Sequence, residues 1–262
     1  MTDQNPYQAP DANLTEGTRG PDVELAVTGI KSLSAGAGLE WVTKAFDLFK
    51  RSPLIWIMLI ILWFVINIVG QFIPIIGWLA MSLLYAVFFA GFMLGCAALE
   101  RGEELEIAHL FAGFKNNTGS LIGLGAIYLG VLVIFGAIVG VLVFSGAGGF
   151  SAMSDPESVN PAQIFSSGTL LSILVALLLF IPIGMMFWFA PPLIALGGVP
   201  LLQSLKMSFM GCLKNIVPML LFGIIMLVLS VIATIPFGLG WLVLMPMAMA
   251  SFYAAYRAIY TD

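Results

Sequence analysis

The chain has 262 residues, of which 60% are hydrophobic and 9% charged, and its net charge is −4. A soluble domain carries about 25% charged residues, so a water-soluble globular fold is excluded and the bilayer is the expected solvent. The weak charge, without any basic run, also argues against a nucleic-acid partner.

Residues 1–37 are rich in Pro, Gly, Asn, Thr and Asp and contain few large apolar side chains. Such a segment buries too little surface to offset the entropy lost on ordering. We expect a disordered tail on the cytoplasmic side that is dispensable for folding.

Six apolar stretches follow, and about 20 helical residues are needed to cross the hydrocarbon core. They cover residues 54–70, 77–99, 119–144, 169–196, 216–234 and 238–260. Their apolar runs lack the alternation of barrel strands. The sequence therefore predicts an all-α membrane fold, a bundle of six transmembrane helices that occupies residues 38–262.

All ten Lys and Arg residues belong to the tail, to the C-terminus or to connections on one side of these spans. The three connections on the other side carry none. Because Lys and Arg beside a span resist translocation, we expect both termini in the cytoplasm. The ten residues are Arg19, Lys31, Lys44, Lys50, Arg51, Arg101, Lys115, Lys206, Lys214 and Arg257.

An internal repeat is suggested by three amphipathic stretches, near 38–51, 104–116 and 201–214, each of which precedes a pair of spans. Apolar side chains recur at steps of three and four residues, which places them on one helical face at the membrane interface. The expected aromatic anchors are Phe46, Phe49, Phe111, Phe114 and Phe209.

The predicted units cover about 38–100, 104–197 and 198–262, all in one orientation, as in parallel repeats. The turn at 73–79 resembles the one at 235–242, and residues 181–184 form a weaker third copy that is displaced into the fourth span. The alternative is a chance likeness among apolar helices.

Small residues four apart are expected to let spans pack closely. Examples are Ala86/Ala90, Gly91/Gly95, Ala250/Ala254 and Gly136/Gly140.

Few side chains are candidates for a site. Asn67 and Gln71 lie four apart and share a helix face, either for hydrogen bonds between helices or for a ligand. Pro191 and Pro192 should kink or end the fourth span, which lines a cavity or accommodates packing. The single histidine, His109, is expected on the surface. No catalytic residue, metal site or cofactor is predicted, and the absence of ionisable residues deep in the spans argues against a proton-coupled transporter.

One stretch resembles a bacterial family of multi-span inner-membrane proteins related to the membrane domain of glycerophosphodiester phosphodiesterase. The resemblance lies in residues 188–218 and extends loosely over 38–260. It implies the inner membrane of a Gram-negative bacterium and no established activity. The motifs are Ala190-Pro191-Pro192-Leu193-Ile194, Gln203-Ser204-Leu205-Lys206-Met207-Ser208-Phe209 and Lys214-Asn215.

These patterns favour a structural, scaffolding or accessory protein that is not an enzyme. A transporter or channel for a neutral or apolar small molecule is the alternative, and an enzyme acting on lipid is a third reading. The expected partners are the lipid bilayer and either other membrane proteins or a second copy of the chain.

Overall fold

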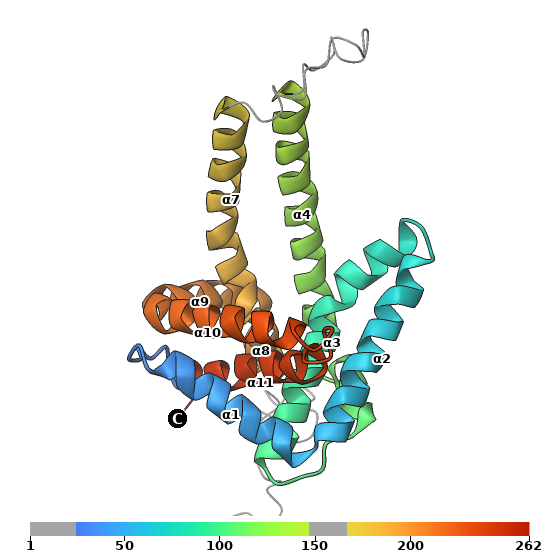
Figure 1. The fold of residues 1–262 in the computed structure, drawn as a ribbon, viewed down its shortest axis with the longest axis vertical. Coiled ribbons are helices and arrows are strands. Elements are labelled where there is room, and N and C mark those ends of the chain that lie inside the picture. Colours follow the sequence, from blue (N-terminus) through green and yellow to red (C-terminus); the bar gives the residue numbers. More distant parts are fainter. Residues whose placement is uncertain (1–24, 147–166, 262) are drawn as a thin grey trace, which may run out of the picture.

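A computed structural model describes residues 25–146 and 167–261, which form helices and connections without a strand among them. Figure 1 shows their arrangement. In chain order the helices are α1 (Ala37–Arg51), α2 (Pro53–Gln71), α3 (Ile76–Glu100), the 3₁₀ helix η1 (Ile107–Phe114), α4 (Thr118–Gly146), α7 (Ser167–Trp188), α8 (Ala190–Ala195), α9 (Leu201–Lys214), α10 (Ile216–Thr234) and α11 (Trp241–Tyr260).

The six-span, all-helical fold is confirmed for the described residues. Six segments are long and apolar enough to cross a membrane, and their ends agree with the predicted stretches to within four residues. The fourth span consists of α7 and α8, which are separated at Phe189 just before the proline pair. The spans thus form three hairpins: α2–α3, α4–α7/α8 and α10–α11.

In the first and third hairpins the second helix lies inside the structure and the first lies outside, whereas both helices of the middle hairpin are mostly exposed, with 22% of the α7/α8 span buried. About half of the span is buried in α3 and α11, but only 11–17% in α2, α4 and α10. Ala86, Ala90 and Ala250 are fully buried, and a methyl group added at Gly91 would lie 2.4 Å from the Leu110 carbonyl oxygen. The small-residue prediction therefore holds for α3 and α11, because these residues allow close backbone contact.

The same prediction is wrong for Gly136 on α4. Neither this residue nor Gly140 has an atom within 4 Å of an added methyl group. Helices α4 and α7 contact each other but stand apart from the other hairpins at the top of Figure 1, so these glycines face no neighbour among the described residues.

The short helices join the hairpins in cyclic order. Helix α1 packs on α11, η1 on α3, and α9 on α7 and α8. Each therefore packs on the second helix of the preceding hairpin, and the first short helix packs on the last hairpin. We call this layer, together with residues 25–36, the base.

The second amphipathic segment differs from its prediction. It is a 3₁₀ helix over Ile107–Phe114 and not an α-helix over 104–116. It runs back along α3 at very short range, since a methyl group added at Gly113 would lie 2.1 Å from the Val87 carbonyl oxygen. At its start the His109 ring nitrogen accepts the Glu106 N–H at 2.9 Å, so the single histidine closes a helix cap.

The aromatic anchors take two positions. Phe46, Phe111 and Phe114 are about 40% exposed, as suits side chains at a membrane interface, and Phe209 is half-buried. Phe49 is instead buried in the core.

Residues 25–36 lie where the sequence predicts the end of a disordered tail. The described part is an extended segment that crosses the base, and its backbone bonds to Leu196, Ile259 and Tyr260 at 2.8–3.0 Å. Asn215 is buried and pairs with the backbone of the same segment. Four side chains of the segment, at Leu25, Val27, Ile30 and Leu33, pack on the core, and average composition hides this pattern. Residues 1–24 lie outside the described part.

Two hairpin turns share an unusual backbone. Ile75 and Phe237 each follow a proline and have φ of 63° and 53°, values that are costly for bulky residues. A glycine near each turn, Gly77 or Gly240, lies so close to the facing helix that no side chain would fit. The suggested third copy, residues 181–184, lies inside α7 and not at a turn, in agreement with its predicted displacement into the fourth span.

Candidate functional site

Two hollows lie between hairpins α2–α3 and α4–α7. The outer hollow, of about 500 Å³, begins at the α2–α3 turn. The inner hollow, of about 300 Å³, ends at Pro191 and Phe252. Both are lined by Tyr85 of α3 and Tyr128 of α4, so we treat them as one cleft.

The structure brings three of the four candidate residues to this cleft. Asn67 and Gln71 line the outer hollow and Pro191 lines the inner one. The fourth, Pro192, is buried among its neighbours and lines neither hollow. Asn67 and Pro191 lie on different hairpins, so no pattern in the sequence places them on the same cleft.

The two ends of the cleft differ in chemistry. Seven of the ten residues that line the inner hollow are aromatic, and their rings contact one another, as Tyr128 and Phe187 do with centroids 5.2 Å apart. The outer hollow adds the amides of Asn67 and Gln71 and the hydroxyl of Ser82. No Lys, Arg, Asp or Glu is among the described residues that line either hollow.

Tyr85 stands where the hollows meet. Its ring lies 4.7 Å from that of Tyr128, centroid to centroid. Its hydroxyl is buried and has no hydrogen-bond partner among the described residues, a situation that costs about 1–3 kcal/mol. Tyr85 was not among the predicted site residues, since a tyrosine in an apolar span gives no signal of an unpaired hydroxyl.

The inner hollow ends at the break between α7 and α8. The prolines lack N–H groups and their rings clash with a continuing helix. Ser208 of α9 repairs the break: its hydroxyl accepts the Phe189 N–H at 2.8 Å and donates to the Met185 carbonyl at 2.7 Å. A hydroxyl from a neighbouring helix thus replaces the direct bond between these two backbone groups. The predicted break is present, but the role of Ser208 was not foreseen.

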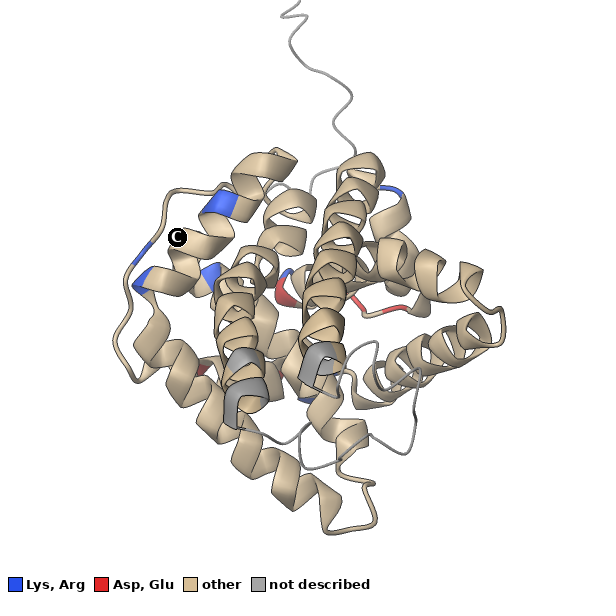
Figure 2. Ribbon diagram, turned by 90° about the horizontal axis from the view of Figure 1, so that it is seen from above, with Lys and Arg blue, Asp and Glu red and all other residues tan. Residues whose placement is uncertain are grey.

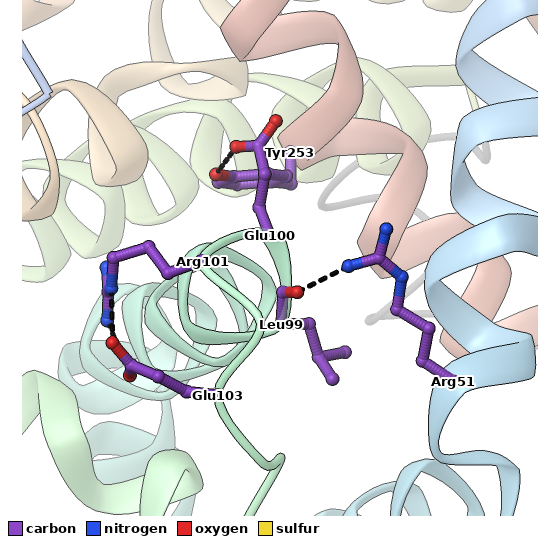
Figure 3. A network of polar contacts seen from close by, with 6 residues as sticks. All are labelled: Arg51, Leu99, Glu100, Arg101, Glu103 and Tyr253. Carbon is purple, nitrogen blue, oxygen red and sulfur yellow. Dashed lines mark hydrogen bonds and ion pairs between the residues drawn. The ribbon is translucent and has the colours of Figure 1, made fainter.

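A polar network at the base joins three helices, as Figure 3 shows. Arg51 of α1 donates to the Leu99 carbonyl at the end of α3. The Glu100 carboxylate accepts the Tyr253 hydroxyl of α11 and pairs with Arg257 at 3.0 Å. These contacts place positive charge at the helix C-terminus, where the dipole favours it, and fasten α1 and α11 to α3.

Arg101 and Glu103 form a second pair beside this network. The Arg101 guanidinium holds the pKa of the exposed Glu103 carboxyl below its ordinary value, mainly through their hydrogen bonds.

Figure 2 looks onto hairpin α4–α7, whose described helices carry no charged residue. Among the described residues no group of three or more His, Cys, Asp or Glu side chains could hold a metal ion.

One relative was found by comparison with known proteins. The chain is 28% identical over 260 aligned positions to a probable inner membrane protein of Burkholderia thailandensis, and the match covers 87% of this chain and 92% of the relative. No family model matches the chain, and no solved structure matches it. The relative and the six apolar helices together support a multi-pass inner-membrane protein.

Proposed function

We propose that this protein is a structural or accessory component of the inner membrane, without catalysis of its own, and that it acts through its base. The observation that carries the proposal is the packed centre. Trp56, Phe92 and Met93 are almost fully buried where α2, α3 and α11 meet, and the first two rings stack 6.4 Å apart. A filled centre suits a rigid support, whereas a channel needs an open path.

The interfacial helices would present the contact surface. Leu202 of α9 is 74% exposed at the base and Leu178 of α7 is 64% exposed within a span. A photo-crosslinking amino acid at Leu202 should form discrete protein adducts in native membranes, and the same group at Leu178 should label lipid. Lipid adducts alone at both positions would contradict the accessory role.

We also propose that both termini face the cytoplasm, so that the base is the cytoplasmic side. The support is the distribution of Lys and Arg. A reporter cysteine at Asp155 should react with an impermeant maleimide from the periplasm, and one at Asp262 should not; both positions lie outside the described residues. Cys96 and Cys212 are buried and should not interfere. The opposite labelling would reverse the topology.

The threefold repeat remains a proposal as well. It is supported by the cyclic packing of the short helices and by the matching backbone of Ile75 and Phe237. Since Thr28 bonds to Tyr260 at 3.0 Å, the described ends are close together. A circular permutant opened between residues 197 and 198 should therefore fold and insert, whereas one opened within α3 should not.

The relation to the membrane domain of glycerophosphodiester phosphodiesterase belongs with these proposals. Its motifs meet in space, because Ser208 bonds to the helix break beside Pro191. A structure of such a membrane domain should show the same bridged break. A continuous helix at that place would refute the proposed relation.

Transport of a neutral or apolar molecule is the second candidate, favoured by the cleft beside Pro191. Such transport should not be driven by protons, because the central parts of the spans contain no ionisable carboxylate. Liposomes with an imposed pH gradient test this. Proton flux that is coupled to a substrate, and lost when a residue within a span is changed, would refute it.

A further inference from the structure

We propose that the cleft between hairpins α2–α3 and α4–α7 binds an uncharged membrane lipid whose head carries hydroxyl groups. The inference goes beyond the accessory role of the base and concerns binding alone. It rests on the shape of the cleft, on the different chemistry of its two ends and on the unpaired hydroxyl between them.

The inner hollow is suited to an apolar chain. It has about 300 Å³ of space with an aromatic lining and lies at the depth of the membrane spans. Ligand pockets commonly have volumes of about 300–1,000 Å³ and mostly apolar walls. Neighbouring residues of α7 such as Leu174 and Leu178 are more than 60% exposed, so the surrounding medium at this level is lipid, and the bilayer is the source of the occupant.

The outer hollow is suited to a small hydroxylated head. Asn67, Gln71 and Ser82 supply groups that both donate and accept hydrogen bonds. The Asn67 amide and the Ser82 hydroxyl each donate to a carbonyl of their own helix, which leaves their oxygen atoms as acceptors for a ligand. Hydroxyl groups match such a mixed lining better than a quinone carbonyl, which only accepts.

The Tyr85 hydroxyl marks the boundary between head and chain. It is buried and unpaired among the described residues, and its ring lines both hollows. The hydroxyl itself has almost no exposed surface, so a ligand hydroxyl or ester oxygen would satisfy it once the side chain turned toward either hollow. A purely apolar occupant would leave it unpaired, so the geometry favours an amphiphile over a hydrocarbon.

The lining also selects against charged heads. A phosphate or carboxylate held in a low-dielectric site needs a cation or several strong donors. The described residues that line the cleft include no Lys or Arg, and the described cations lie in the base, in its connections or in the last turn of α11. Phospholipids and fatty acids should therefore bind more weakly than an acylglycerol.

The test uses the full chain in nanodiscs and a monoacylglycerol with a photoactivatable group in its acyl chain. Unlabelled monooleoylglycerol should compete for labelling, and oleate and phosphatidylglycerol should compete much less. Mass spectrometry should locate the adducts in the α3 and α7 peptides that line the inner hollow. Equal competition by phosphatidylglycerol would overturn the proposal.

Two variants separate binding from folding. Gly184 lines the inner hollow, and a methyl group added there meets no atom within 4 Å, so Gly184→Leu should fill the hollow without a backbone clash and abolish labelling. Gly223→Leu on α10 is the matched control, since Gly223 is equally open and lies outside the cleft. Equal labelling of the two variants would refute the site.

Tyr85→Phe tests the head position. It should weaken binding of monooleoylglycerol about fivefold, the size of one net hydrogen bond. It should not destabilise the free protein, because the hydroxyl is unpaired there. An unchanged affinity would overturn the assignment of the head even if Gly184→Leu proved to be poorly folded.

Discussion

Ser208→Ala should destabilise the protein by about 2 kcal/mol through the break between α7 and α8. The side chain is fully buried and serves both the Phe189 N–H and the Met185 carbonyl. An unsatisfied buried backbone group costs about 1–3 kcal/mol, and polar contacts between membrane helices average about 0.6 kcal/mol with a maximum near 1.7. A loss of two such contacts gives about 2 kcal/mol, or roughly thirtyfold in the folding equilibrium.

Relaxation of the helix should not restore the stability that Ser208→Ala loses. A direct bond from Phe189 to Met185 would require α7 to continue straight into α8, and the rings of Pro191 and Pro192 clash with the preceding turn of a straight helix. Cys212 offers the Met185 carbonyl only a weak thiol donor at 3.5 Å. The Phe189 N–H would therefore stay unpaired in the variant.

The matched control is Ser204→Ala, one turn earlier on α9. Ser204 is equally buried, but its hydroxyl bonds only to the Leu201 carbonyl of its own helix, so its removal should cost less than about 0.5 kcal/mol. Unfolding in mixed micelles with increasing SDS, followed by tryptophan fluorescence, measures both. Equal stability of the two variants would refute the bridging role of Ser208.

Three further predictions concern the base. Deletion of residues 2–24 should leave the unfolding midpoint unchanged, whereas deletion of residues 2–36 should lower it, because the longer deletion removes the docked segment. Equal midpoints for the two deletions would show that residues 25–36 are dispensable for stability. Glu100→Gln should lower the same midpoint, because it removes a half-exposed ion pair and leaves the Tyr253 hydroxyl a neutral amide oxygen in place of a carboxylate. Glu103→Gln, at an exposed pair, should not. Burial raises the pKa of the Cys212 thiol to about 12. A raised pKa favours the folded state only while the thiol stays protonated, so this contribution should be complete well below the ordinary thiol pKa of about 8.5, decline above it as the unfolded thiol ionises, and be lost toward pH 12. Maleimide labelling of native and unfolded protein across that range, with Cys212→Ala as control, should show protection that fails only on unfolding.

The parts of this fold that the sequence predicts are those set by one local pattern. An apolar run of about 20 residues specifies a span whatever it packs against, and adjacent prolines break a helix by their own geometry. The ends of the spans and the break before Pro191 were therefore predictable. The apolar side chains of Leu25 and Val27 can also be read from the sequence, but the average composition of the Gly- and Pro-rich tail conceals them.

The unpredicted parts depend on partners that are distant in sequence. Ser208 looks like one more polar residue of an amphipathic helix until α9 lies against Phe189. The 3₁₀ helix η1 lies in close contact with Gly91 and Val87 of α3, a contact that its own composition does not indicate. Asn67 and Gln71 were recognised as polar residues in a span, yet only the position of the next hairpin places them on a cleft.

The cleft exists because stability is concentrated at one end of the molecule. Helices α3 and α4 touch where a methyl group added at Gly125 would lie 2.1 Å from the Leu83 carbonyl oxygen. Farther along α4, a methyl group added at Gly130 or Gly136 would have no atom within 4 Å, so the hairpins separate beyond the ring of Tyr128. The ion pairs, the docked segment and the bridged break all lie on the base side of that point. The hairpins can therefore separate and leave a lipid-sized space between them, while the contacts at the base hold them together.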